Sequence, residues 1–222
     1  KLLGRTDRSY IRLFEEDTER RAVLILDKSR SMAYGGARAT MTKIEYAKHL
    51  IALMAHVLTS RGDSVALTAF STSGDGEAVP AGRSAAHLRR VVETLAEIKG
   101  AGETQWAPLY RRIAPGTARR TLFLFASDLM TDADEALRGL AALRARRHGV
   151  VLFHVLDPDE RNLPFGGEVV FRDAETGALL ETRADVIRAD YLRSMNAFQS
   201  AAAGACARTG VPYFVADTSV PY

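Results

Sequence analysis

The sequence predicts an α/β fold, built as a doubly wound, mostly parallel sheet with helices on both faces. Two observations support this prediction. Short, continuously apolar runs, such as AVLIL at residues 22–26 and TLFLFA at residues 121–126, are typical of strands covered on both faces. These runs alternate with segments of 3.6-residue apolar periodicity, which is the pattern of strand–helix–strand units in a parallel sheet.

The first half of the chain supplies two of the expected strands and two of the expected helices. We expect strands at residues 22–26 and 65–70, and helices at residues 44–58 and 88–98. The tripeptide Arg61-Gly62-Asp63 lies where a helix must turn into a strand, so we interpret it as a turn. The segment at residues 71–82 is rich in Gly and Ser, and we expect a loop there.

The second half continues the alternation and adds one departure from it. We expect helices at residues 107–113, 136–143 and 192–205, and strands at residues 121–126, 150–156 and 211–215. Residues 168–171 and 178–182 predict a small hairpin inserted between a strand and a helix, at about residues 168–182. Pro212 at the start of the last strand indicates an edge position, because proline cannot donate to a strand ladder.

Composition narrows the class of protein. The 222 residues are 47% apolar and 26% charged, which suits one α/β domain over residues 1–222 and excludes collagen-like, disordered and disulfide-stapled chains. The net charge of +3 predicts no nucleic-acid partner. A single cysteine, Cys206, fits a reducing compartment, and we expect a cytoplasmic domain. No apolar run reaches the roughly 18 residues of a membrane span, so we expect no membrane contact from this segment.

The segment LDKSRSM, directly after the first predicted strand, carries the chemistry. Asp27, Ser29 and Ser31 alternate in this loop, at the carboxyl end of a strand, where open α/β sheets bind ligands. Thr104 in the loop GAGETQW and Asp128 after a later strand lie at equivalent positions. Carboxylates and hydroxyls are hard oxygen donors, suited to Mg²⁺ or Mn²⁺ and poor ligands for zinc or copper.

This pattern resembles a known family. An Asp-x-Ser-x-Ser after the first strand, a Thr in a middle loop and an Asp after a later strand are similar to the metal-ion-dependent adhesion site of von Willebrand factor A domains. The segments RTDRSY, LILDKSRSM, GDSVAL, SDLMTD and VPYFVADTSVPY further resemble the bacterial family called domain of unknown function 58. The resemblance covers residues 5–222. It begins within the pattern, so we expect residues 1–20 to form an N-terminal extension of a domain that belongs to a longer chain.

The resemblance implies a ligand set and a partner. Ser29 and Ser31 would bind Mg²⁺ or Mn²⁺ directly, Asp27 and Asp128 would act partly through water, and Thr104 would enter or leave the coordination shell. One position would stay open for an Asp or Glu of a partner protein. The family further implies a MoxR-type AAA+ ATPase, or its client, as that partner in the maturation of protein complexes.

Several alternatives remain open at this point. Asp27 and Asp128 could instead cap a loop or a helix, and Thr104 could serve its own loop. Glu103 stands where many relatives have a glycine, which keeps a scaffold with a vestigial metal site as a second candidate. A haloacid-dehalogenase-like phosphohydrolase would also place an Asp after its first strand, but it needs a second Asp at position 29, where this chain has serine. We therefore expect an interaction module and no enzyme.

Overall fold

The computed structural model of the protein describes residues 20–72, 77–113, 120–174 and 176–221. A six-stranded sheet with the order β3-β2-β1-β4-β5-β8 forms its centre, and a separate two-stranded sheet pairs β6 with β7. The strands are β1 (Arg21–Asp27), β2 (Ser64–Phe70), β3 (Ala78–Gly82), β4 (Leu122–Ser127), β5 (Gly149–Leu156), β6 (Glu168–Arg172), β7 (Leu179–Arg183) and β8 (Tyr213–Asp217). The helices are the short 3-10 helix η1 (Ser31–Ala33), α1 (Lys43–Ser60), α2 (Ala85–Glu97), α3 (Trp106–Ile113), α4 (Ala133–Ala145), α5 (Pro158–Asn162) and α6 (Ala184–Thr209).

The central sheet has the predicted, mostly parallel arrangement. β1 pairs in parallel with both β2 and β4, and β5 pairs in parallel with β4 and β8. The chain moves to one side of β1 for β2 and to the other side for β4. The crevice outside the carboxyl ends of β1 and β4 is therefore the topological switch point, where such sheets bind ligands.

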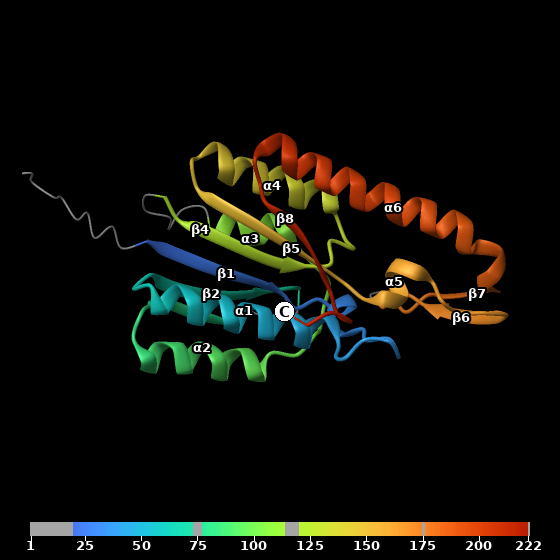
Figure 1. The fold of residues 1–222 in the computed structure, drawn as a ribbon, viewed down its shortest axis with the longest axis horizontal. Helices are drawn as coiled ribbons and strands as arrows, with labels where there is room; N and C mark the ends of the chain where they lie inside the picture. Colours follow the sequence, from blue (N-terminus) through green and yellow to red (C-terminus); the bar gives the residue numbers. More distant parts are fainter. Residues whose placement is uncertain (1–19, 73–76, 114–119, 175, 222) are drawn as a thin grey trace, which may run out of the picture.

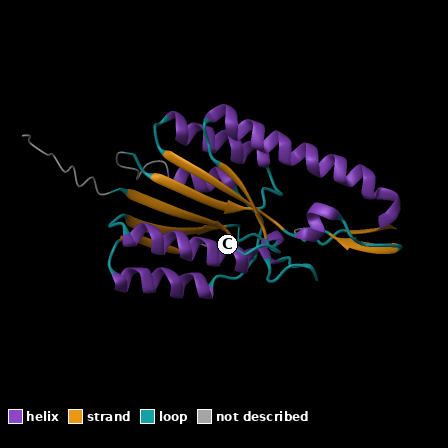
Figure 2. Ribbon diagram, in the orientation of Figure 1, coloured by secondary structure: helices purple, strands orange, loops and turns teal. Residues whose placement is uncertain are grey.

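Helices cover both faces of this sheet, as the apolar strand runs predicted. α1 and α2 pack on one face and α3, α4 and α6 on the other (Figures 1 and 2). Successive side chains of a strand point to opposite faces, and β1 shows this directly. Leu24 and Leu26 pack in the core beneath α1, whereas Val23 and Ile25 pack in the core beneath α3 and α4.

Strand β3 corrects the sequence prediction for residues 71–82, which was a loop. Ala78–Gly82 pairs antiparallel with β2 at the edge of the sheet. Only one of its five residues, Val79, is buried, so the segment has no apolar run to reveal it. Pro80 fits this position because an edge strand needs no donor on its outer side.

The hairpin and the short helix before it lie beyond the end of the central sheet, beside the first turns of α6 (Figure 1). The hairpin is confirmed within one residue at each strand, and β8 is confirmed as an edge strand. Helix α5 was not predicted, because five residues are too few for a periodic pattern. Its signal is a capping box, in which the Asp157 side chain accepts at the start of the helix and Glu160 reaches back to the Asp157 backbone.

Two predictions concern the ends of the chain and the membrane. Residues 1–19, which make up nearly all of the predicted N-terminal extension, lie outside the described residues. Among the helices of the described ranges, none combines the length and the apolar character that a membrane span requires.

Candidate metal centre

The five predicted ligands come from three loops at one edge of the sheet. β1 ends at Asp27 and β4 ends at Ser127, and because the two strands are parallel neighbours, Asp27 and Asp128 lie at the same edge. Thr104 precedes α3 in a third loop. All five side chains are buried or nearly so, with at most 9% of any of these residues exposed, at Ser31.

Ser29 and Ser31 form the tightest part of this arrangement. The Asp27 Oδ1 atom accepts a hydrogen bond from the Ser29 backbone N–H at 2.9 Å, which folds the loop back over the strand end. The two serine hydroxyls then lie 3.0 Å apart. Neighbouring ligands of an octahedral Mg²⁺ with bonds of about 2.1 Å are separated by about 3 Å. The spacing of the two hydroxyls therefore fits two adjacent positions around one ion.

Two further hydroxyls contact the Asp27 carboxylate. Thr104 Oγ1 donates to Asp27 Oδ2 at 3.2 Å, so the structure brings this predicted residue to the site. Ser127 Oγ donates to the same oxygen at 2.6 Å. Sequence reasoning missed Ser127, although its position at the end of β4, directly before Asp128, could have indicated it.

Asp128 is held by a buried lysine. Lys43 Nζ lies 2.7 Å from Asp128 Oδ2 and 2.5 Å from Glu160 Oε1, and neither Lys43 nor Asp128 is exposed. The other oxygen, Asp128 Oδ1, accepts from the Met130 backbone N–H at 3.2 Å. Burial alone would lower the pKa of Lys43, but the two carboxylates outweigh it and the pKa is raised. Lys43 is therefore a fixed positive charge within the site.

Sequence reasoning missed Lys43 and Glu160 as well. One signal existed for the lysine. It is the first residue of α1, where the helix dipole disfavours a cation, so its position points to a specific acidic partner.

The electrostatics of the site favour a cation beside Asp27. Burial, together with the nearby charge of Asp128, raises the pKa of Asp27 to about 7, although hydrogen bonds from Ser127 and Ser29 act to lower it. The surroundings of Asp27 thus disfavour its charged form. A second cation beside the carboxylate would stabilise that form. The Lys43 ammonium pairs with the carboxylates of Asp128 and Glu160.

The donor set therefore fits a hard divalent ion in kind, and the Ser29 and Ser31 hydroxyls also fit it in spacing. Within the described part of the chain, no three His, Cys, Asp or Glu side chains gather into a metal-binding group. The candidate centre is built differently, from two carboxylates and three hydroxyls.

Trp106 joins two of the three loops. It is fully buried, so it does not line the rim of the site. Its indole N–H donates to the backbone carbonyl of Thr131, in the loop after Asp128, at 3.1 Å. The Thr104 loop and the Asp128 loop are therefore tied together behind the site. Asp128 does not cap α4, because the N-cap residue of that helix is Asp132.

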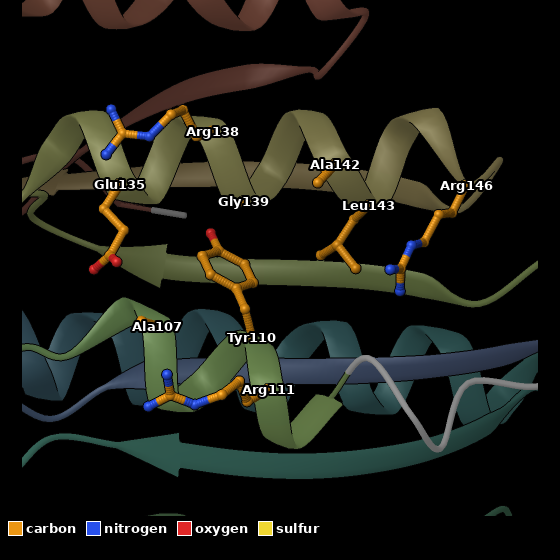
Figure 3. Close-up of a pocket in the computed structure, with 9 residues that line it drawn as sticks. All are labelled: Ala107, Tyr110, Arg111, Glu135, Arg138, Gly139, Ala142, Leu143 and Arg146. Atoms are coloured by element: carbon orange, nitrogen blue, oxygen red, sulfur yellow. The ribbon is translucent and has the colours of Figure 1, made fainter.

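Two of the cavities lined by described residues differ in their relation to the candidate ligands. A groove of about 360 Å³ runs between α3 and α4, and none of the five predicted ligands lines it (Figure 3). A second cavity of about 380 Å³ is lined by Ser31, by residues of α5 and by the hairpin.

The fold places the chain in a class of known domains. The structure matches the von Willebrand A domain of SpRpn10 with a TM-score of 0.51 and 9% identity, over 91% of this chain and 90% of that one. It matches BatB from Bacteroides thetaiotaomicron with a TM-score of 0.54 and 18% identity, over 89% and 90% of the two chains. It also matches an aerotolerance-related membrane protein from Bacteroides fragilis, with a TM-score of 0.57 and 18% identity, over 90% of this chain and 92% of that one. The chain thus has the von Willebrand A fold.

Its family is more specific than its fold. The chain belongs to the family described as "Protein of unknown function DUF58", whose model matches residues 1–201. It is 28% identical over 214 residues to the uncharacterised protein Rv1480 of Mycobacterium tuberculosis. This match covers 94% of the chain but 66% of that relative, so the chain spans just under two thirds of the relative's length.

Proposed function

We propose that this domain is a non-enzymatic interaction module that holds Mg²⁺ or Mn²⁺ and binds a carboxylate of a partner protein through it. The observation that carries this proposal is the convergence of Ser29, Ser31 and Thr104 around Asp27. Ser29 and Ser31 would bind the ion through their hydroxyls, with Asp27, Asp128 and Thr104 close behind them. When bound, the ion would supply a positive charge that attracts an Asp or Glu in a partly dry crevice.

The residues of the chain have separate tasks in this proposal. Ser127 orients the Asp27 carboxylate by donating a hydrogen bond to it. Trp106 holds the Thr104 loop against the Asp128 loop through its hydrogen bond to Thr131. Lys43 neutralises Asp128, so fewer protein charges compete with an incoming carboxylate for the ion. The family resemblance supports a MoxR-type AAA+ ATPase or its client as the partner.

One observation favours a second candidate, a scaffold that binds no ion. The Lys43 ammonium already lies on Asp128, at 2.7 Å, and both of the Asp128 oxygens have donors. A domain stabilised by this internal cation could dock its partner without a metal.

Calorimetric titration with Mg²⁺ and Mn²⁺ separates the two candidates. We expect saturable binding of one ion to the wild-type domain and none to the Asp27→Asn, Ser29→Ala double variant. Asparagine keeps the shape of Asp27, so the variant should fold. The matched control is Ser60→Ala with Asp63→Asn, at the end of α1 and directly before β2, at the opposite edge of the sheet. Absence of binding by the folded wild-type domain would establish the scaffold and overturn the metal proposal.

The partner is tested separately. A purified MoxR-type ATPase from the same organism should bind the immobilised wild-type domain in Mg²⁺, and lose binding in EDTA or with the double variant. Equal binding of the ATPase in all three conditions would show that it binds the domain without the metal centre.

A further inference from the structure

One wall of the cavity beside Ser31 is formed by the hairpin β6–β7. The hairpin lies next to the site loop, because Arg30 Nη1 donates to the Ala174 carbonyl, in the turn after β6, at 3.4 Å. Phe171 and Asp173 of the hairpin line the cavity together with Ser31. The cavity volume of about 380 Å³ lies within the range of ligand pockets in proteins.

Aromatic rings form much of the lining. They come from four separate segments of the chain: Tyr34, Phe165, Phe171 and Tyr191. Phe165 and Phe171 meet edge to face, with ring centroids 5.8 Å apart. Aromatic faces attract cations through the ring quadrupole and also pack against aliphatic side-chain stems.

Carboxylates complete the lining, from Asp159, Glu160 and Asp173. Glu160 is paired with Lys43, whereas no basic side chain of the described ranges forms an ion pair with Asp159. Only 6% of Asp159 is exposed, and its Oδ2 atom accepts from the Tyr34 hydroxyl at 3.2 Å. Among the residues that the structure describes, no donor reaches Asp159 Oδ1.

The negative charge of these acids affects the hydroxyl of Tyr34. Burial raises the pKa of the Tyr34 hydroxyl, and the charges of Asp159, Asp157 and Glu160 raise it further. Among the described residues that line the cavity, Arg172 is the basic one. Its guanidinium extends toward the hairpin turn, where an ideal Cβ on Gly177 would lie 3.9 Å from Nη2. The pocket therefore presents negative charge and aromatic faces together.

We propose that this pocket binds a lysine or arginine side chain of a partner protein. Its aliphatic stem would pack between the aromatic rings, and its charged head would meet Asp159 and Asp173. Since Ser31 lines the same cavity, the partner segment would carry a basic residue close to the acidic residue that reaches the metal; this last step rests on the proposed function.

The test uses small probes and no metal. The wild-type domain is titrated in EDTA with Nα-acetyl-lysine N-methylamide, with the arginine analogue and with the neutral norleucine analogue, and binding is followed by NMR. We expect both cationic probes to shift resonances of Tyr34, Phe171 and Tyr191 with millimolar affinity, and norleucine to bind markedly more weakly.

Charge removal should abolish this preference. Asp159→Asn with Asp173→Asn keeps the acceptor oxygens for Tyr34 and for the hairpin turn, and should weaken the cationic probes about tenfold. The control variant, Glu168→Gln with Glu181→Gln, removes two carboxylates of the same hairpin that do not line the cavity, and should leave binding unchanged.

Each other outcome overturns the proposal. Equal binding of norleucine would make the pocket a site for apolar side chains, and absence of shifts with every probe would exclude a side-chain pocket. The probes are titrated in EDTA, and the metal ions are titrated without probes. Failure of the probes to bind and failure of the metal to bind are therefore independent results.

Discussion

The Lys43 ammonium is a fixed positive charge inside the candidate metal centre. It is fully buried and contacts two carboxylates, Asp128 and Glu160. Removing one partner of such a group leaves the others charged and without compensation in a poorly solvated position, which costs far more than losing a surface ion pair.

We expect Lys43→Met to lower the free energy of unfolding by about 3 kcal/mol, measured by urea denaturation. Lys48→Met is the matched control on the same helix, because Lys48 pairs with the half-exposed Glu45 and should contribute less than about 1 kcal/mol. Adding Asp128→Asn and Glu160→Gln to Lys43→Met should recover most of the loss. Equal losses in the two lysine variants would contradict the assigned role.

The sequence could predict part of this site and not the rest. Asp27, Ser29 and Ser31 lie within five residues at the end of an obvious strand, and Asp128 follows the end of the neighbouring strand β4, whereas Thr104 comes from the loop between α2 and α3. Lys43 reaches Asp128 across 85 positions of the chain and Glu160 across 117, and only the packing of α1 over the sheet brings them together. Whether these residues hold an ion stays a prediction.

Helices α3 and α4 begin directly after two of the site loops, and they pack through one close contact. Tyr110 of α3 points at Gly139 of α4, and its hydroxyl donates to the Ala136 carbonyl at 2.7 Å (Figure 3). A Cβ atom on Gly139 would lie 1.9 Å from Tyr110 Cε2, so the ring occupies the space that a side chain would need.

We therefore expect Gly139→Ala to lower the free energy of unfolding by about 1–3 kcal/mol, although alanine favours helix more than glycine does. Gly204→Ala on α6 is the control. There the new Cβ meets only the flexible end of Arg208, at 3.4 Å, and the variant should gain roughly 0.5–1 kcal/mol. A gain in both variants would show that the Tyr110 contact is not restrictive.

His154 on β5 makes the folded protein sensitive to acid. Its Nδ1 lies 2.6 Å from the Tyr213 hydroxyl and its Nε2 lies 2.9 Å from the Asp128 carbonyl, so both ring nitrogens of this buried histidine have partners. Burial lowers its pKa from 6.5 to about 4. Between these pH values the unfolded chain binds a proton that the folded chain does not, so the free energy of unfolding falls as the pH falls.

We expect this effect to reach about 3 kcal/mol between pH 7 and pH 4, in urea denaturation series. His154→Gln keeps a donor and an acceptor but does not titrate, so the variant should lose stability less steeply over the same range. Parallel curves for wild type and variant would assign the acid sensitivity to other groups.

Many of the elements that were predicted correctly have a long or continuous apolar signal, although the short hairpin strands do not. The strands β1, β4 and β5 are nearly continuous apolar runs, and α1, α2 and α6 are long enough for their periodicity to be recognised. β3 and α5 have five residues each and bury little apolar surface. β3 is stabilised by its pairing with β2, and α5 is stabilised by its capping box.

At the scale of the whole molecule, the described residues form a central sheet with its helices and a hairpin that, within those residues, shares no backbone ladder with that sheet. Three apolar side chains of the hairpin, Val170, Leu179 and Leu180, are each at least 59% exposed. The hairpin therefore contributes little buried apolar surface to the common core.

We expect the hairpin to be removable without unfolding the domain. Glu168 pairs with Arg183, so the residues between them can be replaced by Asn-Gly, which suits a tight hairpin turn. The shortened domain should unfold in one cooperative transition within a few degrees of the wild-type melting temperature and should still bind Mg²⁺ as the wild type does. Loss of cooperative unfolding would show that the hairpin supports the core.

The strand order also determines how the chain reaches this structure. Leu24 of the central strand β1 pairs with Leu67 on one side and with Leu124, a hundred residues later, on the other. Contacts so distant in sequence close slowly, and one edge of β1 stays unpaired until β4 has been synthesised and docked. A cation in the cell therefore meets the complete set of candidate ligands only after the central sheet has closed, and it can stabilise the finished fold but cannot guide its first steps.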